Sequence, residues 1–197
     1  MNINNYIKRI KKDISKNIEL SKKNICFSIG ENCLPDNILN RYNLKSFSSP
    51  YSSGRSNIEY ILYYEHEEFK SFVDNKLLRK ELFNNTSEVI RNQKIQLNNT
   101  YHESCMNGFE FTHHNVLEDD KARAAIKRRC SRLLGLHNKN IVMLYHHRLC
   151  ENTDEMLLIK HLKELSDIYK QRNNKVSIFC FTQTIVNDLS QRKVKKI

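Results

Sequence analysis

One stretch near the N-terminus decides the fold: Ile25-Cys26-Phe27-Ser28-Ile29-Gly30-Glu31-Asn32-Cys33-Leu34-Pro35-Asp36. Its apolar run predicts a buried strand that ends at Gly30, and Pro35 followed by Asp36 suits the first turn of a helix. Cys33 is therefore expected at a helix N-terminus, where partial positive charge favours the thiolate over the thiol. The thiolate is a candidate nucleophile. The alternative is that Cys33 is a small apolar filler at a strand–helix corner.

Apolar strands alternate with amphipathic helices through the last third of the chain, and this pattern predicts the fold class. Continuous apolar strands in such an alternation are typical of a parallel sheet that is covered on both faces. The sequence thus predicts a single α/β domain over residues 25–197, with a mainly parallel sheet covered by helices. Its expected helices are 34–42, a helix from the Ser56/Glu59 capping box, 122–134, 158–169 and one from about Thr184, and its expected strands are 25–29, 45–49, 141–145 and 176–181.

Two other segments are less regular. Residues 70–105 are polar and rich in asparagine, and there we expect a short helix near 75–82 and a strand near 94–97. Residues 1–24 are expected to form a basic amphipathic helix, because isoleucines recur at helical spacing from Ile3 to Ile18. That helix would pack on the domain or on a partner. The alternative is contact with an anionic membrane surface, which the lack of aromatic anchors apart from Tyr6 makes the weaker interpretation.

The net charge of +11 is concentrated at the two ends of the chain. Residues 1–24 hold seven Lys or Arg against two acidic residues, and residues 191–197 hold four basic residues and no acidic one. The body between them is nearly neutral. A nucleic-acid enzyme would carry basic and aromatic residues together on its working face, so this distribution argues against nucleic acid as the partner.

Composition also bears on location and on metal binding. No apolar stretch approaches the roughly 20 residues of a membrane span, and the N-terminus lacks an apolar signal region. We therefore expect a cytoplasmic protein whose six cysteines are reduced. None of them forms a Cys-x-x-Cys pair, so the sequence predicts no metal site and no cofactor.

Three segments, in this order, resemble a bacterial family of unknown function that is described as putative papain-like cysteine peptidases. They are Ser28–Pro35, Phe47–Ser56 and Gly108–Asn115. The resemblance implies that Cys33 is the nucleophile and that His114 or His113 is the base. In such a pair the histidine removes the thiol proton and later protonates the leaving group.

This chain departs from the family at two places. Many members carry an aspartate where Asn115 stands, and an Asp-Trp pair where Ser52-Ser53 stands. The residue that orients the imidazole is therefore open among Asn115, Asp119, Asp120 and Gln183. A strict papain architecture would also put the histidine on an antiparallel sheet, whereas the local pattern here favours parallel strands.

Further candidates follow from the strand ends, because ligands bind at the carboxyl ends of parallel strands. We expect Gly30–Cys33, His146-His147-Arg148 and Thr182-Gln183 to open onto one edge of the sheet. One histidine of each adjacent pair should point outward, since neighbouring strand residues face opposite ways. The segment Ser52-Ser53-Gly54-Arg55-Ser56 at a helix start resembles an anion cradle, in which Ser53, Gly54 and Arg55 would bind the anion. The alternative is a capped turn.

The leading functional hypothesis is a cysteine-dependent hydrolase, peptidase or acyl transferase that acts on a peptide, amide or ester bond. Cys33 would attack with His114 (or His113) as base, and backbone amides near Asn32 and Cys33 would bind the oxyanion. A second hypothesis uses the same strand-end pocket to bind or transfer a phosphorylated or nucleotide-linked sugar, held by Arg55 and Arg148. A third is a non-enzymatic interaction protein whose N-terminal helix docks a partner.

Overall fold

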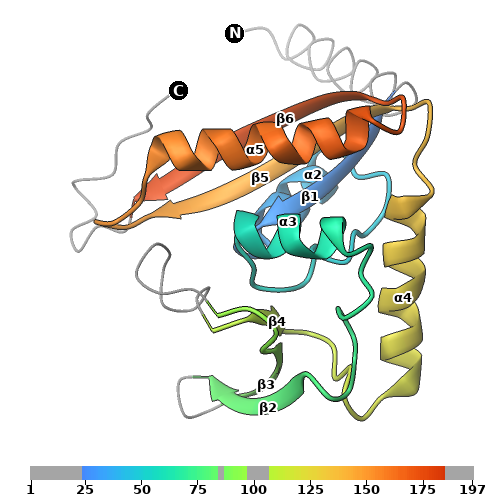
Figure 1. Cartoon of the computed structure of the whole chain (residues 1–197), viewed down its shortest axis with the longest axis vertical. Coiled ribbons are helices and arrows are strands. Elements are labelled where there is room, and N and C mark those ends of the chain that lie inside the picture. Colours follow the sequence, from blue (N-terminus) through green and yellow to red (C-terminus); the bar gives the residue numbers. More distant parts are fainter. Residues whose placement is uncertain (1–23, 84–86, 97–106, 185–197) are drawn as a thin grey trace, which may run out of the picture.

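A three-stranded parallel sheet carries the N- and C-terminal parts of the described chain (Figure 1). The computed structural model describes residues 24–83, 87–96 and 107–184. The strands lie in the order β1-β5-β6, which makes the long β5 the central strand. Their bounds are β1 Ile25–Gly30, β5 Asn140–Leu149 and β6 Lys175–Thr184.

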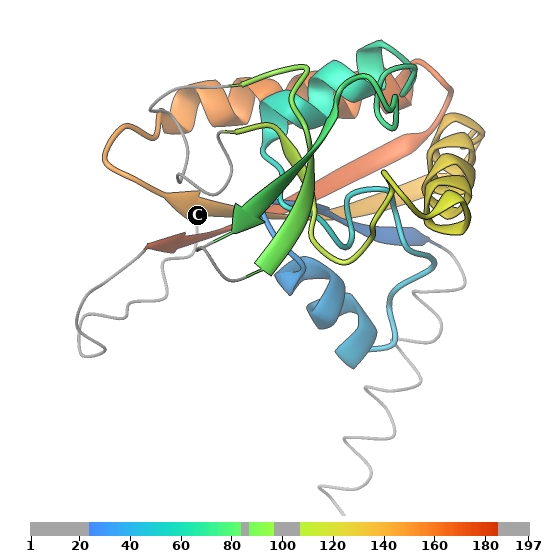
Figure 2. The ribbon, with the colours of Figure 1, turned by 90° about the horizontal axis from the view of Figure 1, so that it is seen from below.

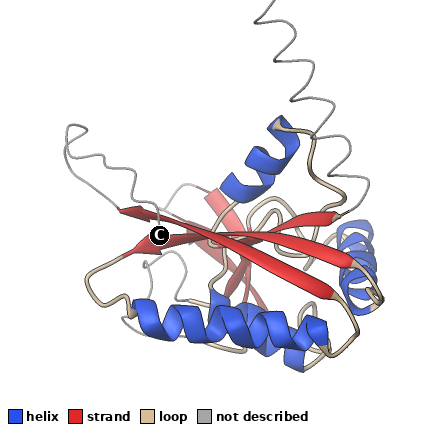
Figure 3. Cartoon of the chain, turned by 90° about the horizontal axis from the view of Figure 1, so that it is seen from above, coloured by secondary structure: helices blue, strands red, loops and turns tan. Residues whose placement is uncertain are grey.

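Helices cover the two faces of this sheet unequally. The short helix α2 (Leu34–Arg41) lies on one face, and α5 (Glu155–Lys170) together with α3 (Ile58–His66) lies on the other (Figures 2 and 3). The periodic apolar residues of α5 explain its position, because its own side chains Leu158, Leu165 and Tyr169 form the buried face of the helix. Helix α4 (Asp120–Leu134) runs along the side of the molecule and leads from the second sheet back to β5 (Figure 1).

The second sheet is antiparallel, which corrects the expectation of a mainly parallel fold. It contains β2 (Leu78–Phe83), β3 (Ser87–Asn92) and β4 (Phe109–Phe111), with β3 in the centre. Residues near 75–82 therefore form the approach to β2 and most of that strand, and not the expected helix. The described residues 94–96 do not form the expected strand either. The described part of the chain is mixed α/β, with two sheets of three strands each.

Two smaller expectations also fail, each for a local reason. Residues 45–49 are not a strand, although Ser46 makes two hydrogen bonds with the backbone of Cys26 beside the outer edge of β1. The N-cap of α3 is Asn57 and not Ser56, because the Asn57 side chain accepts a hydrogen bond from the Tyr60 amide. The Ser56 hydroxyl instead donates to the Asn57 carbonyl.

Buried aromatic rings join α3 to the antiparallel sheet. The rings of Tyr64 and Phe72 lie 4.6 Å apart between centroids, and those of Phe72 and Phe109 lie 4.7 Å apart. Most of these contacts are edge-to-face, the arrangement that aromatic quadrupoles favour. Since Tyr51 also packs on Phe109, the segment that precedes α3 is held against β4.

Two expected helices lie outside the described residues: the basic amphipathic helix of residues 1–24, of which only Asn24 is described, and the helix that was expected from about Thr184. Thr184 itself ends β6. In the part of the chain that the structure describes, no helix combines the length and apolar character needed to cross a membrane.

Candidate functional site

A cavity of about 420 Å³ lies where the end of β1 meets the antiparallel sheet. Four segments contribute to it: the turn into α2, the loop of residues 49–57 that precedes α3 (here called the strap), the turn after β4 and the end of β5. The lining residues are Asn32, Cys33, Leu34, Asn37, Ser53, Gly54, Arg55, Thr112, His113 and Arg148. The cavity thus combines one thiol, one imidazole and two guanidinium groups, and no carboxylate of the described residues lines it.

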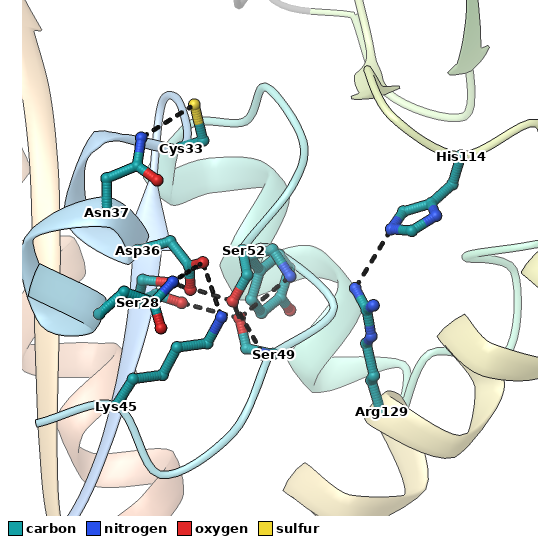
Figure 4. A network of polar contacts seen from close by, with 11 residues as sticks. Ser28, Cys33, Asp36, Asn37, Lys45, Ser49, Ser52, His114 and Arg129 are labelled. Atoms are coloured by element: carbon teal, nitrogen blue, oxygen red, sulfur yellow. Dashed lines mark hydrogen bonds and ion pairs between the residues drawn. The ribbon is translucent and has the colours of Figure 1, made fainter. Parts of the chain in front are cut away.

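Cys33 occupies the N-cap position of α2, as its sequence context predicts. Its side chain makes no capping hydrogen bond, and its sulfur lies 4.0 Å from the Asn37 Nδ2 atom, a long contact (Figure 4). The Leu34 amide is bonded to Asn32 Oδ1 at 2.9 Å. The thiol is half-buried and lines the cavity at the positive end of the helix dipole.

The turn that presents Cys33 requires a glycine at its start. Gly30 has φ +122°, and a Cβ there would lie 2.6 Å from the backbone nitrogen of His146 on β5. The close approach allows the next residue to continue the pairing, because the Glu31 amide donates to the His146 carbonyl at 3.2 Å. Gly30 thus keeps the turn tight against the central strand.

Glu31 fastens the same turn to the following residues of β5. Its carboxylate is fully buried, with Oε1 3.0 Å from His147 Nδ1 and Oε2 accepting the Arg148 amide at 3.0 Å. A buried carboxylate is tolerated only when such partners compensate for its lost hydration. The Glu31–His147 pair therefore fixes the segment that carries Cys33 relative to the one that carries Arg148.

A network of buried hydroxyl groups holds the strap against β1 and α2 (Figure 4). Ser28 Oγ donates to Asp36 Oδ1 at 2.8 Å and lies 2.9 Å from Ser52 Oγ. Ser49 Oγ donates to the Ser28 carbonyl at 2.7 Å, and Lys45 Nζ lies 2.7 Å from Asp36 Oδ2. The strap residues Ser53 to Arg55 directly follow this network, so it positions one wall of the cavity.

Arg55 is joined to β4 by its backbone and by its side chain. Its amide and carbonyl pair with Glu110 at 2.9 and 3.0 Å, and its Nη1 atom lies 3.4 Å from Glu110 Oε1. Glu110 is fully buried and also binds Arg91 Nη2 at 2.5 Å. A Cβ on Gly54 would lie 2.6 Å from the Glu110 carbonyl oxygen, so glycine permits this close approach.

The two histidines that follow β4 lie in different surroundings. His113 is exposed and lines the cavity with Cys33. His114 lies 3.4 Å through Nε2 from Arg129 Nη1 on α4, beside that guanidinium rather than beside the Cys33 thiol (Figure 4). Burial, the Arg129 charge and His113 lower the pKa of His114, so its neutral form is favoured.

Asn115 belongs to a local turn. It exchanges hydrogen bonds with Glu118, donating to Oε2 at 2.8 Å and accepting the Glu118 amide at 3.1 Å. With His113 and His114 it lines a smaller neighbouring hollow of about 230 Å³. The larger cavity thus brings Cys33 together with His113, whereas His114 and Asn115 do not line it.

His146 and His147 lie within β5, which continues to Leu149, and not beyond the end of a strand. Both are buried, at 0% and 1% exposure, so the expectation that one would point outward is wrong. His146 Nε2 lies 3.2 Å from Gln183 Oε1 on β6, and burial is the largest cause that lowers the pKa of His146. Arg148 lines the cavity, and neither histidine nor Gln183 does.

Sequence reasoning missed Glu31 and Glu110 as residues that position the site. Each carried a signal that could have been noticed, because Glu31 directly follows the apolar strand that is expected to be buried and Glu110 stands between Phe109 and Phe111. A carboxylate in such a place must be paired. Among the described residues, no group of three or more His, Cys, Asp or Glu side chains is placed to hold a metal ion.

Comparison with known proteins finds a matching family model. A family model described as "putative papain-like cysteine peptidase", a domain family of unknown function, matches residues 24–188. No curated protein and no solved structure matches the chain.

Proposed function

The chain belongs to the family described as "putative papain-like cysteine peptidase", and we propose that it is a cysteine-dependent peptidase or related acyl-transfer enzyme with Cys33 as nucleophile and His113 as base. The observation that carries the proposal is that these two side chains line one cavity, although Cys33 follows a strand of the parallel sheet and His113 follows a strand of the antiparallel sheet. Cys33 stands at the N-terminus of α2, the positive end of the helix dipole. An exposed imidazole in the same cavity can accept the thiol proton.

The reaction proceeds in two halves. His113 takes the proton from the Cys33 thiol, and the thiolate attacks the carbonyl carbon of the substrate. The carbon–nitrogen or carbon–oxygen bond then breaks, and the imidazolium returns the proton to the leaving amine or alcohol. Water, deprotonated by the same imidazole, hydrolyses the thioester and restores the thiol. In an acyl transferase another nucleophile replaces the water.

The negative oxygen that forms during attack needs hydrogen-bond donors. The Leu34 amide is already bonded to Asn32 Oδ1, so the proposed donors are the backbone amides of Asn32 and Cys33. Both precede the first turn of α2, where the helix dipole adds to their effect.

A second candidate uses the same cavity without chemistry at sulfur. Arg55 and Arg148 both line it and could hold the phosphate of a phosphorylated or nucleotide-linked sugar, with Cys33 as part of the wall. The observation that favours it is the presence of two guanidinium groups in a cavity that no carboxylate from residues 24–83, 87–96 or 107–184 lines.

Alkylation by the neutral reagent iodoacetamide at pH 7 separates the two candidates, with each cysteine followed by peptide mapping. An activated Cys33 should react roughly tenfold faster in the folded chain than in the urea-unfolded chain. Burial raises the pKa of Cys26, of Cys130 and, to about 11, of Cys180, so these thiols should be slow. Equal rates for folded and unfolded Cys33 would overturn the nucleophile assignment.

A further inference from the structure

The charge of the cavity around Cys33 has one sign. Arg55 and Arg148 line it, and His113 adds a third group that becomes positive when protonated. The carboxylates of Glu110 and Glu31 lie near the cavity without lining it, and each already has a partner. Glu110 binds Arg91 at 2.5 Å, and Glu31 lies 3.0 Å from His147. The cavity therefore faces its ligand with cations and with uncharged polar groups.

Arg148 is the more available of the two guanidinium groups. Its backbone amide is fixed to Glu31, but its side chain forms no ion pair with a carboxylate of the described residues. The side chain is half-buried, so its charge is screened less by solvent than that of a surface arginine. Arg55 is partly compensated, since its Nη1 atom lies 3.4 Å from Glu110 Oε1.

A guanidinium group binds a carboxylate through two parallel hydrogen bonds, and partial burial makes such a contact stronger. Both arginines share the cavity with the Cys33 sulfur. A carboxylate held by them would lie close to the bond that the thiolate attacks. An uncharged group in the same place would leave the Arg148 charge uncompensated in a partly desolvated cavity, which costs free energy.

We propose that the substrate carries a carboxylate next to the bond that Cys33 attacks, as an acidic peptide or acyl group does, and that Arg148, assisted by Arg55, binds this carboxylate. The inference rests on the proposed function, because it assigns the substrate class of that same site. It makes Arg148 a residue that determines specificity.

Two thiol reagents that differ in charge provide the test. Iodoacetate and iodoacetamide both alkylate a thiolate: a sulfur–carbon bond forms, the carbon–iodine bond breaks and iodide leaves. Only iodoacetate carries a carboxylate next to the reacting carbon. The measured quantity is the iodoacetate rate divided by the iodoacetamide rate at Cys33, determined in the full-length folded chain and again in the urea-unfolded chain.

We expect this ratio to be about tenfold higher in the folded chain, the size of effect that one charge-assisted contact produces. Arg148→Gln should abolish most of this increase in the ratio. Arg148→Lys should keep part of the increase, since lysine retains the charge without the bidentate geometry. Arg128→Gln is the matched control, because Arg128 is an exposed residue of α4 that does not line the cavity, and it should leave the ratio unchanged.

The outcomes separate this inference from the proposed function. A ratio equal in folded and unfolded chains would overturn the carboxylate assignment even if iodoacetamide showed an activated Cys33. A slow iodoacetamide reaction with a raised ratio would overturn the nucleophile and keep the anion site. Succinate and inorganic phosphate, added as competitors of iodoacetamide, identify the anion: protection at lower concentration by succinate supports a carboxylate, and protection only by phosphate would overturn it.

Discussion

The Nδ1 atom of His147 lies 3.0 Å from the Oε1 atom of Glu31, and both side chains are buried to 2% exposure or less. The pair joins the turn that follows β1 to the central strand β5. Because Cys33 is two residues beyond Glu31 and Arg148 is next to His147, one buried contact sets the relative position of two cavity residues. The contact therefore has consequences for both stability and reactivity.

Replacing Glu31 with alanine should remove this connection. We expect Glu31→Ala to lower the free energy of unfolding by roughly 3 kcal/mol, because it leaves buried polar groups of β5 without their acceptor. In urea titrations, the exposed Glu151→Ala change serves as control and should have an effect within about 0.5 kcal/mol. Equal effects of the two substitutions would show that the pair contributes nothing to the fold.

The base assignment predicts a difference between adjacent histidines. His113→Ala should slow iodoacetamide labelling of Cys33 near pH 7 by roughly tenfold, because it removes the imidazole that accepts the thiol proton. His114→Ala is the matched control and should change the rate by about twofold or less, since His114 lies beside Arg129 and does not line the cavity. A larger effect at His114 would contradict the assignment of His113 as the base and would favour His114 instead.

Gly30 should tolerate no side chain. A Cβ at this position would lie 2.6 Å from His146 N, and the backbone has φ +122°. We expect Gly30→Ala to destabilise the fold by about 3 kcal/mol, from steric conflict and backbone strain together. Gly135→Ala, at φ −80° after α4, should change stability by about 1 kcal/mol or less. Thermal unfolding of both variants tests this, and a stable Gly30→Ala protein would contradict it.

The stability of the protein should depend on pH through Glu65, which is buried beneath α5. Burial is the largest effect on this carboxyl and raises its pKa from 4.5 to about 7, although Tyr169 donates to it at 2.8 Å. Between about pH 4.5 and pH 7, Glu65 therefore keeps its proton in the folded chain and has lost it in the unfolded chain. The Glu65 contribution is therefore fully present below about pH 4.5 and is lost as the pH rises through 7, by about 3 kcal/mol at most.

Glu65→Gln isolates this effect, because glutamine keeps the shape and does not ionise. We expect the unfolding free energy of the variant, relative to wild type, to rise between pH 5 and pH 8 in urea titrations. Glu68→Gln is the control: Glu68 has an exposed side chain, and this variant should follow wild type at both pH values. Parallel pH profiles for Glu65→Gln and wild type would contradict the raised pKa.

Sequence patterns predicted the elements with strong local periodicity and failed in the segment that lacks a clear period. Strands 25–29, 141–145 and 176–181 and the helices between 122 and 169 appear near their expected places. The polar, asparagine-rich segment after residue 70 gave no clear period, and its strands are defined by pairing with one another and with β4. Contact across a sheet is not visible in a local pattern.

The sequence by itself determined that Cys33 follows a buried strand and begins a helix, because Gly30, Pro35 and Asp36 act on the backbone within a few residues of them. Only the tertiary structure decided that His113, rather than His114, shares a cavity with Cys33, and that Glu31 is buried against His147. His113 and His114 are the same residue type at adjacent positions, yet His113 lines the cavity and His114 lies beside Arg129. Which of them faces the cavity depends on how the antiparallel sheet packs beside β1 and β5, a relationship between residues about 80 positions apart.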